Sequence, residues 1–208
     1  VEEKGIYSVE KFIVARRLMY WQVYLHKTSL VAEQLLLRLL KRAKELSQQG
    51  VSLPATPALH YFLTTPISKD SFSSEGLEQF SKLDDYDIVS AIKMWIDVED
   101  AVLRTIAKML LHRDLLKIKM KKKPIPSERK QSKKSALMKR EGFTEAEADY
   151  FVFEGVISNL AYRMDHNAII LLRKNGKMID VAKASDQLNI EALSETVIKY
   201  YLCYPKSL

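Results

Sequence analysis

The sequence contains very little cysteine, glycine or proline, and it has no long hydrophobic run. Its single cysteine, Cys203, cannot form a disulfide within the chain, which excludes a disulfide-rich secreted scaffold and favours a reducing, cytoplasmic compartment. Six glycines and six prolines among 208 residues exclude collagen-like and low-complexity classes. No apolar run reaches the roughly 18–20 residues that span a bilayer, so no association with a membrane is expected.

The rest of the composition is that of a folded globular protein, with 47% hydrophobic and 28% charged residues. The first residues, VEEKGIYSVEK, lack an initiator methionine and the apolar core of a signal peptide. We therefore expect the sequence to be a processed or truncated piece of a longer protein.

Positive charge is concentrated in one segment, residues 117–140. The whole chain carries a net charge of +7, whereas this segment alone holds nine Lys, two Arg and one Glu, a net of +10. Like charges at this density repel one another, so the segment is expected to be a solvated, mobile linker. The alternative is a site for a polyanion such as nucleic acid or nucleotide phosphate.

Periodicity predicts a helical first half followed by mixed elements. Helices are expected over 8–48, 58–63, 75–83, 85–96 and 99–112, and strands over 115–120, 168–173, 177–184 and 196–204. The strands at 168–184 flank Asn175-Gly176, a hairpin signal, and Thr144 with Glu147 forms a capping box for a helix to about residue 161. A further helix is expected over 185–193.

This order predicts a mainly α protein with a small C-terminal α+β subdomain of the ferredoxin-like, split βαβ type. The corresponding domains are a helical region, residues 1–114, and the α+β subdomain, residues 115–208, which includes the basic segment 117–140.

Signatures of a catalytic centre are missing from the sequence. None of its four histidines lies at the spacing of a metal site, and there is no nucleophile elbow, phosphate-binding glycine loop or dinucleotide fingerprint. We therefore predict no catalytic residue, no metal ligand and no cofactor in this chain.

One helical face carries a row of side chains suited to a phosphorylated ligand. At about 100° per residue, Arg16, Tyr20, Tyr24 and Lys27 fall together, with His26 on the adjoining flank. A guanidinium and an ammonium can bind phosphate, and a tyrosine ring can pack on a sugar or base. The alternative is the solvent-facing stripe of an amphipathic helix.

The stretch that contains this row, YSVEKFIVARRLMYWQVYLHKTSLVAEQLLLRLLKRA, resembles the long helix that follows the catalytic core in HD-domain phosphohydrolases. The similarity is greatest to a bacterial group related to deoxynucleoside triphosphate triphosphohydrolases, and it is best over 5–47, 83–120 and 180–206. It implies a C-terminal portion of such an enzyme, which would act on a dNTP (dGTPase-like) or another nucleotide phosphoester. By this resemblance Arg16 contacts phosphate and Tyr24 the sugar, while Tyr20, His26 and Lys27 line the pocket.

The sequence departs from that family in one respect, because it contains no His-Asp dipeptide. The resemblance therefore implies that the metal motif precedes Val1, that a divalent metal is bound by the full-length parent, and that this chain alone is inactive. It also implies a nucleotide substrate bound together with the missing N-terminal half, and a homo-oligomer. Two alternatives remain: a non-catalytic module for nucleotide, nucleic acid or subunit binding, and a divergent member that kept the fold and lost the chemistry.

Overall fold

The structure, a computed structural model, describes residues 1–68, 73–159, 168–185 and 196–208. Contacts between Cα atoms divide the chain into two compact units, and neither unit is a continuous segment. Unit 1 comprises Val1–Leu30, Ile118–Lys130 and Glu154–Leu202, and unit 2 comprises Val31–Lys117, Gln131–Phe153 and Cys203–Leu208. The predicted domains, residues 1–114 and 115–208, are two continuous segments, and this division stays a prediction.

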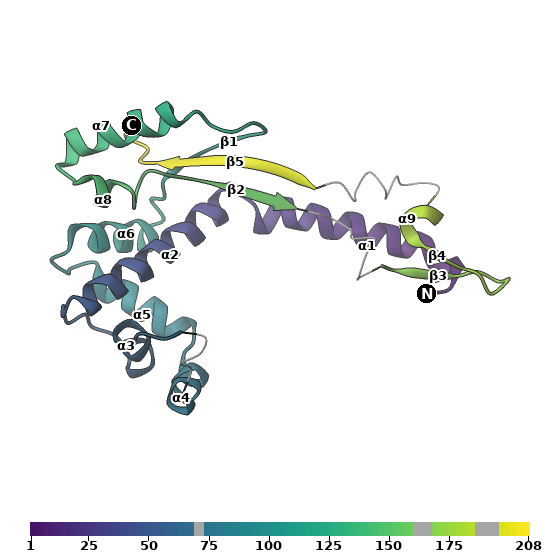
Figure 1. Cartoon of the computed structure of the whole chain (residues 1–208), viewed down its shortest axis with the longest axis horizontal. Coiled ribbons are helices and arrows are strands. Elements are labelled where there is room, and N and C mark those ends of the chain that lie inside the picture. Colours follow the sequence, from purple (N-terminus) through teal and green to yellow (C-terminus); the bar gives the residue numbers. More distant parts are fainter. Residues whose placement is uncertain (69–72, 160–167, 186–195) are drawn as a thin grey trace. The chain divides into compact units, whose positions relative to one another are not determined.

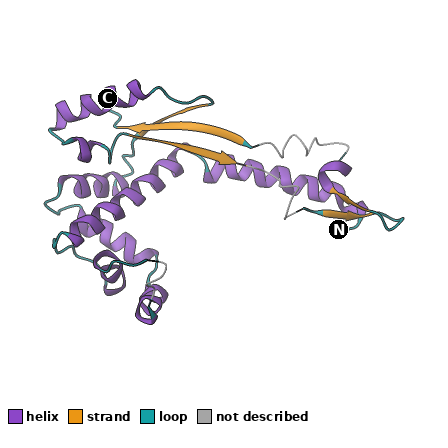
Figure 2. Cartoon of the chain, viewed as in Figure 1, coloured by secondary structure: helices purple, strands orange, loops and turns teal. Residues whose placement is uncertain are grey.

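Helices dominate the described residues, as Figure 2 shows, and the mainly α class with a small α+β part is confirmed. The elements are labelled in Figure 1. The helices, with one short 3-10 turn (η1) and one π-helical turn (η2), are η1 (Glu3–Gly5), α1 (Ile6–Met19), η2 (Tyr20–Tyr24), α2 (Lys27–Gln48), α3 (Pro57–Thr64), α4 (Ser74–Lys82), α5 (Asp85–Trp95), α6 (Ala101–Leu111), α7 (Ser127–Glu141), α8 (Glu145–Ala148) and α9 (Val181–Ala184). The strands are β1 (Lys117–Lys121), β2 (Phe153–Asn159), β3 (Ile170–Leu172), β4 (Met178–Asp180) and β5 (Val197–Tyr204).

The four helices α3 to α6 lie where the sequence places them, and side-chain caps define the starts of α4, α5 and α6. The Ser73 side chain accepts a hydrogen bond from the Gly76 amide at the start of α4. At the start of α5 the Asp84 carboxylate accepts a hydrogen bond from the Asp87 amide, and the Asp84 amide donates one to the Asp87 carboxylate. Trp95, at the end of α5, is fully buried in unit 2, and its indole N–H donates to the Pro54 carbonyl at 2.9 Å.

The prediction of one continuous helix over residues 8–48 is wrong. Helix α1 begins at Ile6 and ends at Met19, the π-helical turn η2 follows, and α2 begins at Lys27. No Pro or Gly marks the break. The residues of η2, YWQVY, are aromatic or β-branched except for one Gln, and such residues have low helix propensity.

The linker interpretation of the basic segment is also wrong, because most of it forms helix α7. Lys134 and Leu137 of this helix are buried in unit 2, at 6% and 3% exposure. The Lys134 ammonium forms ion pairs with Glu145 at 2.9 Å and with Asp149 at 2.8 Å. These carboxylates offset the repulsion among the lysines. The linker interpretation took account of that repulsion but not of carboxylates outside the basic segment.

The helix expected from Thr144 to residue 161 starts correctly but ends early. Thr144 and Glu147 form the predicted capping box, yet α8 ends at Ala148 and strand β2 begins at Phe153. Between them Tyr150, Phe151 and Val152 are large and buried, and β-branched and aromatic residues favour a β-strand over a helix. Residues 160 and 161 lie outside the described residues.

The strands form two separate sheets among the described residues. Three strands pair in the order β1-β5-β2, and β3 pairs with β4 in an antiparallel hairpin that aligns Leu171 with Ile179. The hairpin confirms the Asn175-Gly176 prediction, and Gly176 has the positive φ of 78° that its turn requires. The single sheet of a ferredoxin-like unit is therefore not seen in the described part of the chain.

Two of the predicted C-terminal elements have other outcomes. The strand expected over 177–184 ends at Asp180, where the side chain accepts a hydrogen bond from the Ala182 amide and caps α9. In unit 1 this short helix, the hairpin and α1 share an apolar core of Ile6, Ile13, Leu171, Val181 and Ala182. The helix expected over 185–193 lies outside the described residues from residue 186 on.

Burial protects the only cysteine of the sequence. Cys203 has no exposed surface, and burial raises the pKa of its thiol to about 12. Since the thiolate is the reactive form, we expect a disulfide reagent such as dithiobisnitrobenzoate to label the native protein at pH 8 far more slowly than the urea-unfolded protein. Equal labelling rates in the two states would contradict the buried position.

Gly155 in β2 packs directly against Tyr201 of β5. A methyl group at position 155 would lie 2.5 Å from Cζ and 2.8 Å from Cε1 of that ring, closer than real side chains approach. We expect Gly155→Ala to lower the free energy of unfolding by about 1–3 kcal/mol, the usual cost of overpacking. Urea denaturation would measure it. The control is Gly142→Ala, where nothing lies within 4 Å and only the positive φ of 73° opposes the change.

Candidate functional site

The π-helical turn η2 (Tyr20–Tyr24) is the local feature that organises the predicted binding row. In a π-helical turn the amide bonds to the carbonyl five residues earlier, and here the Leu25 amide donates to the Tyr20 carbonyl at 2.7 Å. Single π-helical turns within α-helices are frequent at functional sites. All residues of the turn lie in unit 1.

Three of the five predicted site residues lie side by side here. The Arg16 guanidinium lies 5.6 Å from the centre of the Tyr20 ring, and the Tyr20 and Tyr24 rings are 5.1 Å apart and tilted by 48°. Arg16 is exposed and Tyr24 is 55% exposed, whereas Tyr20 is half-buried. We name Arg16, Tyr20 and Tyr24 the Arg–Tyr row.

The Arg–Tyr row is accessible and its cation is available. Among the described residues no carboxylate forms an ion pair with Arg16, whose guanidinium lies over the Tyr20 ring. A guanidinium held on a ring face keeps its planar fork of donors free for a carboxylate or phosphate group. The geometry therefore suits an anionic ligand that also carries a ring or sugar.

The other two predicted residues, His26 and Lys27, follow the break in the helix and are exposed. The His26 Nδ1 atom accepts a hydrogen bond from the Thr28 amide at 3.3 Å, so the neutral ring carries its proton on Nε2. Lys27 is the first residue of α2. The angle of 100° per residue that placed Lys27 beside Arg16 does not apply across a π-helical turn. The binding roles of all five residues stay predictions.

A sixth residue, which the sequence argument missed, lies beside the turn. The Lys199 ammonium of β5 lies 3.8 Å from the centre of the Trp21 ring, within unit 1. This contact joins residues far apart in the sequence, and no local pattern at Lys199 distinguishes it from other lysines. It places a second cation against the π-helical turn η2.

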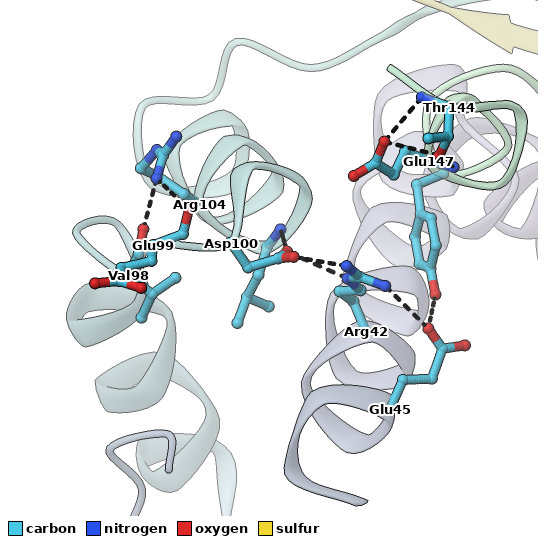
Figure 3. Close-up of polar contacts among 10 residues, drawn as sticks. Arg42, Glu45, Val98, Glu99, Asp100, Arg104, Thr144 and Glu147 are labelled. Carbon is cyan, nitrogen blue, oxygen red and sulfur yellow. Dashed lines mark hydrogen bonds and ion pairs between the residues drawn. The ribbon is translucent and has the colours of Figure 1, made fainter. Parts of the chain in front are cut away.

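Unit 2 contains a polar network that is structural in character (Figure 3). Arg42 forms two hydrogen bonds with Asp100, from Nε at 3.2 Å and from Nη2 at 2.6 Å. Its guanidinium also lies 3.6 Å from Glu45, whose carboxylate accepts a hydrogen bond from the Tyr150 hydroxyl. Burial raises the pKa of Tyr150, and the bond to Glu45 raises it further. This phenol therefore stays protonated at neutral pH.

Metal-binding side chains do not gather in the described part of the chain, where no group of three or more His, Cys, Asp and Glu could hold an ion. Nor does any helix among those residues combine the length and apolarity needed to cross a bilayer.

Comparisons with known proteins relate this geometry to a family. Residues 1–53, which include the Arg–Tyr row, match the model of the HD associated region. The whole chain is 28% identical over 216 residues to the uncharacterized protein YwfO of Bacillus subtilis (strain 168), of which it covers 47%. The crystal structure of the phosphohydrolase BT4208 from Bacteroides thetaiotaomicron VPI-5482 is 44% identical, with a TM-score of 0.92.

That structural match covers 99% of this chain and 52% of the phosphohydrolase, so the chain spans about half the length of the relatives that it matches. The predicted family and the observed fold agree, because the matched residues 1–53 contain the π-helical turn and the structural match extends over nearly all the rest. Over nearly its whole length the chain is thus similar to a portion of a phosphohydrolase, and its residues 1–53 match the HD associated region.

Proposed function

We propose that the longer protein is a metal-dependent phosphohydrolase that acts on a nucleoside triphosphate, with a dNTP as the favoured substrate, and that this chain supplies its C-terminal portion. The observation that carries the proposal is the Arg–Tyr row, in which the exposed guanidinium of α1 and the two tilted tyrosine rings of η2 lie side by side. The match of residues 1–53 to the HD associated region supports it.

The roles follow from the chemistry of each side chain. Arg16 binds the phosphate chain, because its planar fork can donate two parallel hydrogen bonds to phosphate oxygens. Tyr24 packs on the sugar, and the neighbouring Tyr20 ring holds the guanidinium. His26 and Lys27, exposed just beyond the turn, line the same pocket, with the His26 Nε2–H as a donor.

The metal belongs to a different part of the proposal. The described residues of this chain hold no cluster of metal ligands, so we derive no catalytic step through a metal from them. We propose that the remaining half of the longer protein binds a divalent ion, which would activate the attacking water. What this chain contributes is binding and orientation of the substrate, and assembly of the protein into a homo-oligomer is part of the same proposal.

The proposal is tested by identifying the products formed by the longer protein. A panel of dGTP, the other dNTPs, GTP and p-nitrophenyl phosphate is incubated with the protein in Mg²⁺ or Mn²⁺, and products are separated by anion-exchange chromatography. We expect a nucleoside and triphosphate from at least one dNTP. Nucleotide binding without turnover of any substrate would instead support a non-catalytic module, and release of single phosphates would exclude a triphosphohydrolase.

A further inference from the structure

A second cation-rich site lies in unit 1, where β1 leaves the three-stranded sheet and the chain turns into α7. A cavity of about 310 Å³ opens there, lined by Lys119, Lys121, Lys123 and Arg129 together with apolar residues that include Ile125 and Leu202. All of these residues belong to unit 1, so the site depends on one compact unit only.

The local structure explains why four cations meet at this point. Lys119 and Lys121 are two residues apart on β1, and alternate residues of a strand project from the same face. Lys123 continues this spacing just beyond the strand. Arg129 comes from the first turn of α7, whose amino end carries partial positive charge; Glu128 in the same turn does not line the cavity.

None of the four cations is neutralised within the described residues. Two other lysines of the basic segment do have carboxylate partners: Lys130 pairs with Glu154 at 3.3 Å, and Lys134 pairs with Glu145 and Asp149. No such partner is present for Lys119, Lys121, Lys123 or Arg129 in the described chain. Four unpaired positive charges around one cavity repel each other, and a bound polyanion would remove that repulsion.

Size and lining decide which polyanion fits. The cavity is at the lower end of the 300–1,000 Å³ range of small-molecule sites. Leu202 in its wall is fully buried, and the lining residues include no aromatic side chain on which nucleic-acid bases could stack. A compact phosphate chain can pair with the four cations, and the apolar wall can contact the organic group to which the phosphate chain is attached.

We propose that this cavity binds a small polyphosphate ligand, such as the phosphate chain of a nucleotide, at a site separate from the Arg–Tyr row. The two sites use different residues, since the row lies at Arg16 to Tyr24 and the cavity at Lys119 to Arg129. The proposal therefore does not depend on the protein being a hydrolase.

The test uses the full-length protein carrying Arg16→Ala, so that binding at the Arg–Tyr row is removed from the signal. Calorimetric titration with inorganic tripolyphosphate, ATP and a twelve-nucleotide single strand is carried out without divalent metal, at low and moderate KCl. In this background we add Lys121→Gln with Arg129→Gln. The matched control, Lys122→Gln with Lys139→Gln, removes two exposed charges from the same basic segment that do not line the cavity.

We expect tripolyphosphate and ATP to bind the Arg16→Ala protein, and the Lys121/Arg129 pair of changes to weaken that binding about tenfold or more. The control pair should weaken the binding of tripolyphosphate and ATP by less than about threefold, because it lowers only the net charge of the segment. Absence of tripolyphosphate binding, or equal weakening by the two pairs, would overturn the proposal. Binding of the single strand without binding of tripolyphosphate or ATP would also overturn it, in favour of nucleic acid.

Discussion

Replacing Arg16 by alanine is expected to lower the kcat/KM of the longer protein for its nucleotide substrate by about 10–150-fold. A hydrogen bond between a guanidinium and a phosphate contributes roughly 1.5–3 kcal/mol, and its loss from the transition state appears in kcat/KM. Arg16 has no competing ion pair among the described residues, so its removal leaves no carboxylate unpaired and creates no cavity. The substitution should therefore weaken the contact with the substrate and leave the fold intact.

Two further variants separate a phosphate contact from a general charge effect. Arg16→Lys should recover little activity, because an ammonium cannot reproduce the planar fork of the guanidinium. Lys11→Ala removes an exposed positive charge from the same helix, α1, and should leave kcat/KM within about twofold of the unaltered protein. Steady-state kinetics, with circular dichroism to verify folding, measures all three. Unchanged turnover by Arg16→Ala would return this face to the role of a solvent-exposed stripe.

Replacing Asp100 by alanine is expected to lower the free energy of unfolding of unit 2 by about 3 kcal/mol. The Asp100 carboxylate forms a bidentate pair with Arg42 and also accepts a hydrogen bond from the Leu103 amide at 2.8 Å, which caps α6. The two side chains are only 16% and 19% exposed, so truncation leaves a largely buried guanidinium with Glu45 as its remaining partner. Loss of a buried pair costs about 3–5 kcal/mol, reduced here by partial exposure, and loss of a cap adds about 1 kcal/mol.

Urea denaturation followed by circular dichroism and by the fluorescence of the buried Trp95 measures this change. The matched control is Asp97→Ala, at an exposed position just before the same helix, which should change stability by less than about 0.5 kcal/mol. In a double-mutant cycle, Arg42→Ala with Asp100→Ala should cost clearly less than the sum of the two single changes. Additive costs would show that the pair contributes no interaction energy.

The contribution of Asp100 should also depend on pH in a defined direction. Burial would raise the pKa of this carboxyl, but the hydrogen bonds from Arg42 and from the Leu103 amide outweigh burial and hold the pKa below its ordinary value. A group whose pKa is lowered by folding stabilises the protein above its unfolded pKa, about 4 here, and loses that contribution as pH falls through the folded value. The stability gap between the protein and Asp100→Asn should therefore stay constant from pH 7 to pH 5 and narrow below pH 4. A gap that narrows between pH 7 and pH 5 would contradict the lowered pKa.

Much of the fold could be predicted from the sequence because its signals are local. Asp84 and Thr144 each form a capping box with a carboxylate three residues later, and each starts a helix where expected. Asn175-Gly176 forms the turn of the hairpin, since glycine tolerates the positive φ that this turn needs. In such cases neighbouring residues supply all the hydrogen bonds, so no distant contact is required.

The sequence by itself thus determined the helix caps, the hairpin and the positions of Arg16, Tyr20 and Tyr24 along one helical stretch. Only the tertiary structure decided that the basic segment forms a helix, because the charge of Lys134 is offset by Glu145 and Asp149, eleven or more residues later in the chain. It also decided the ending of α8 and the contact of Lys199 with Trp21. Each of these depends on burial or on a charge supplied by a distant residue, and a pattern read along the chain contains neither.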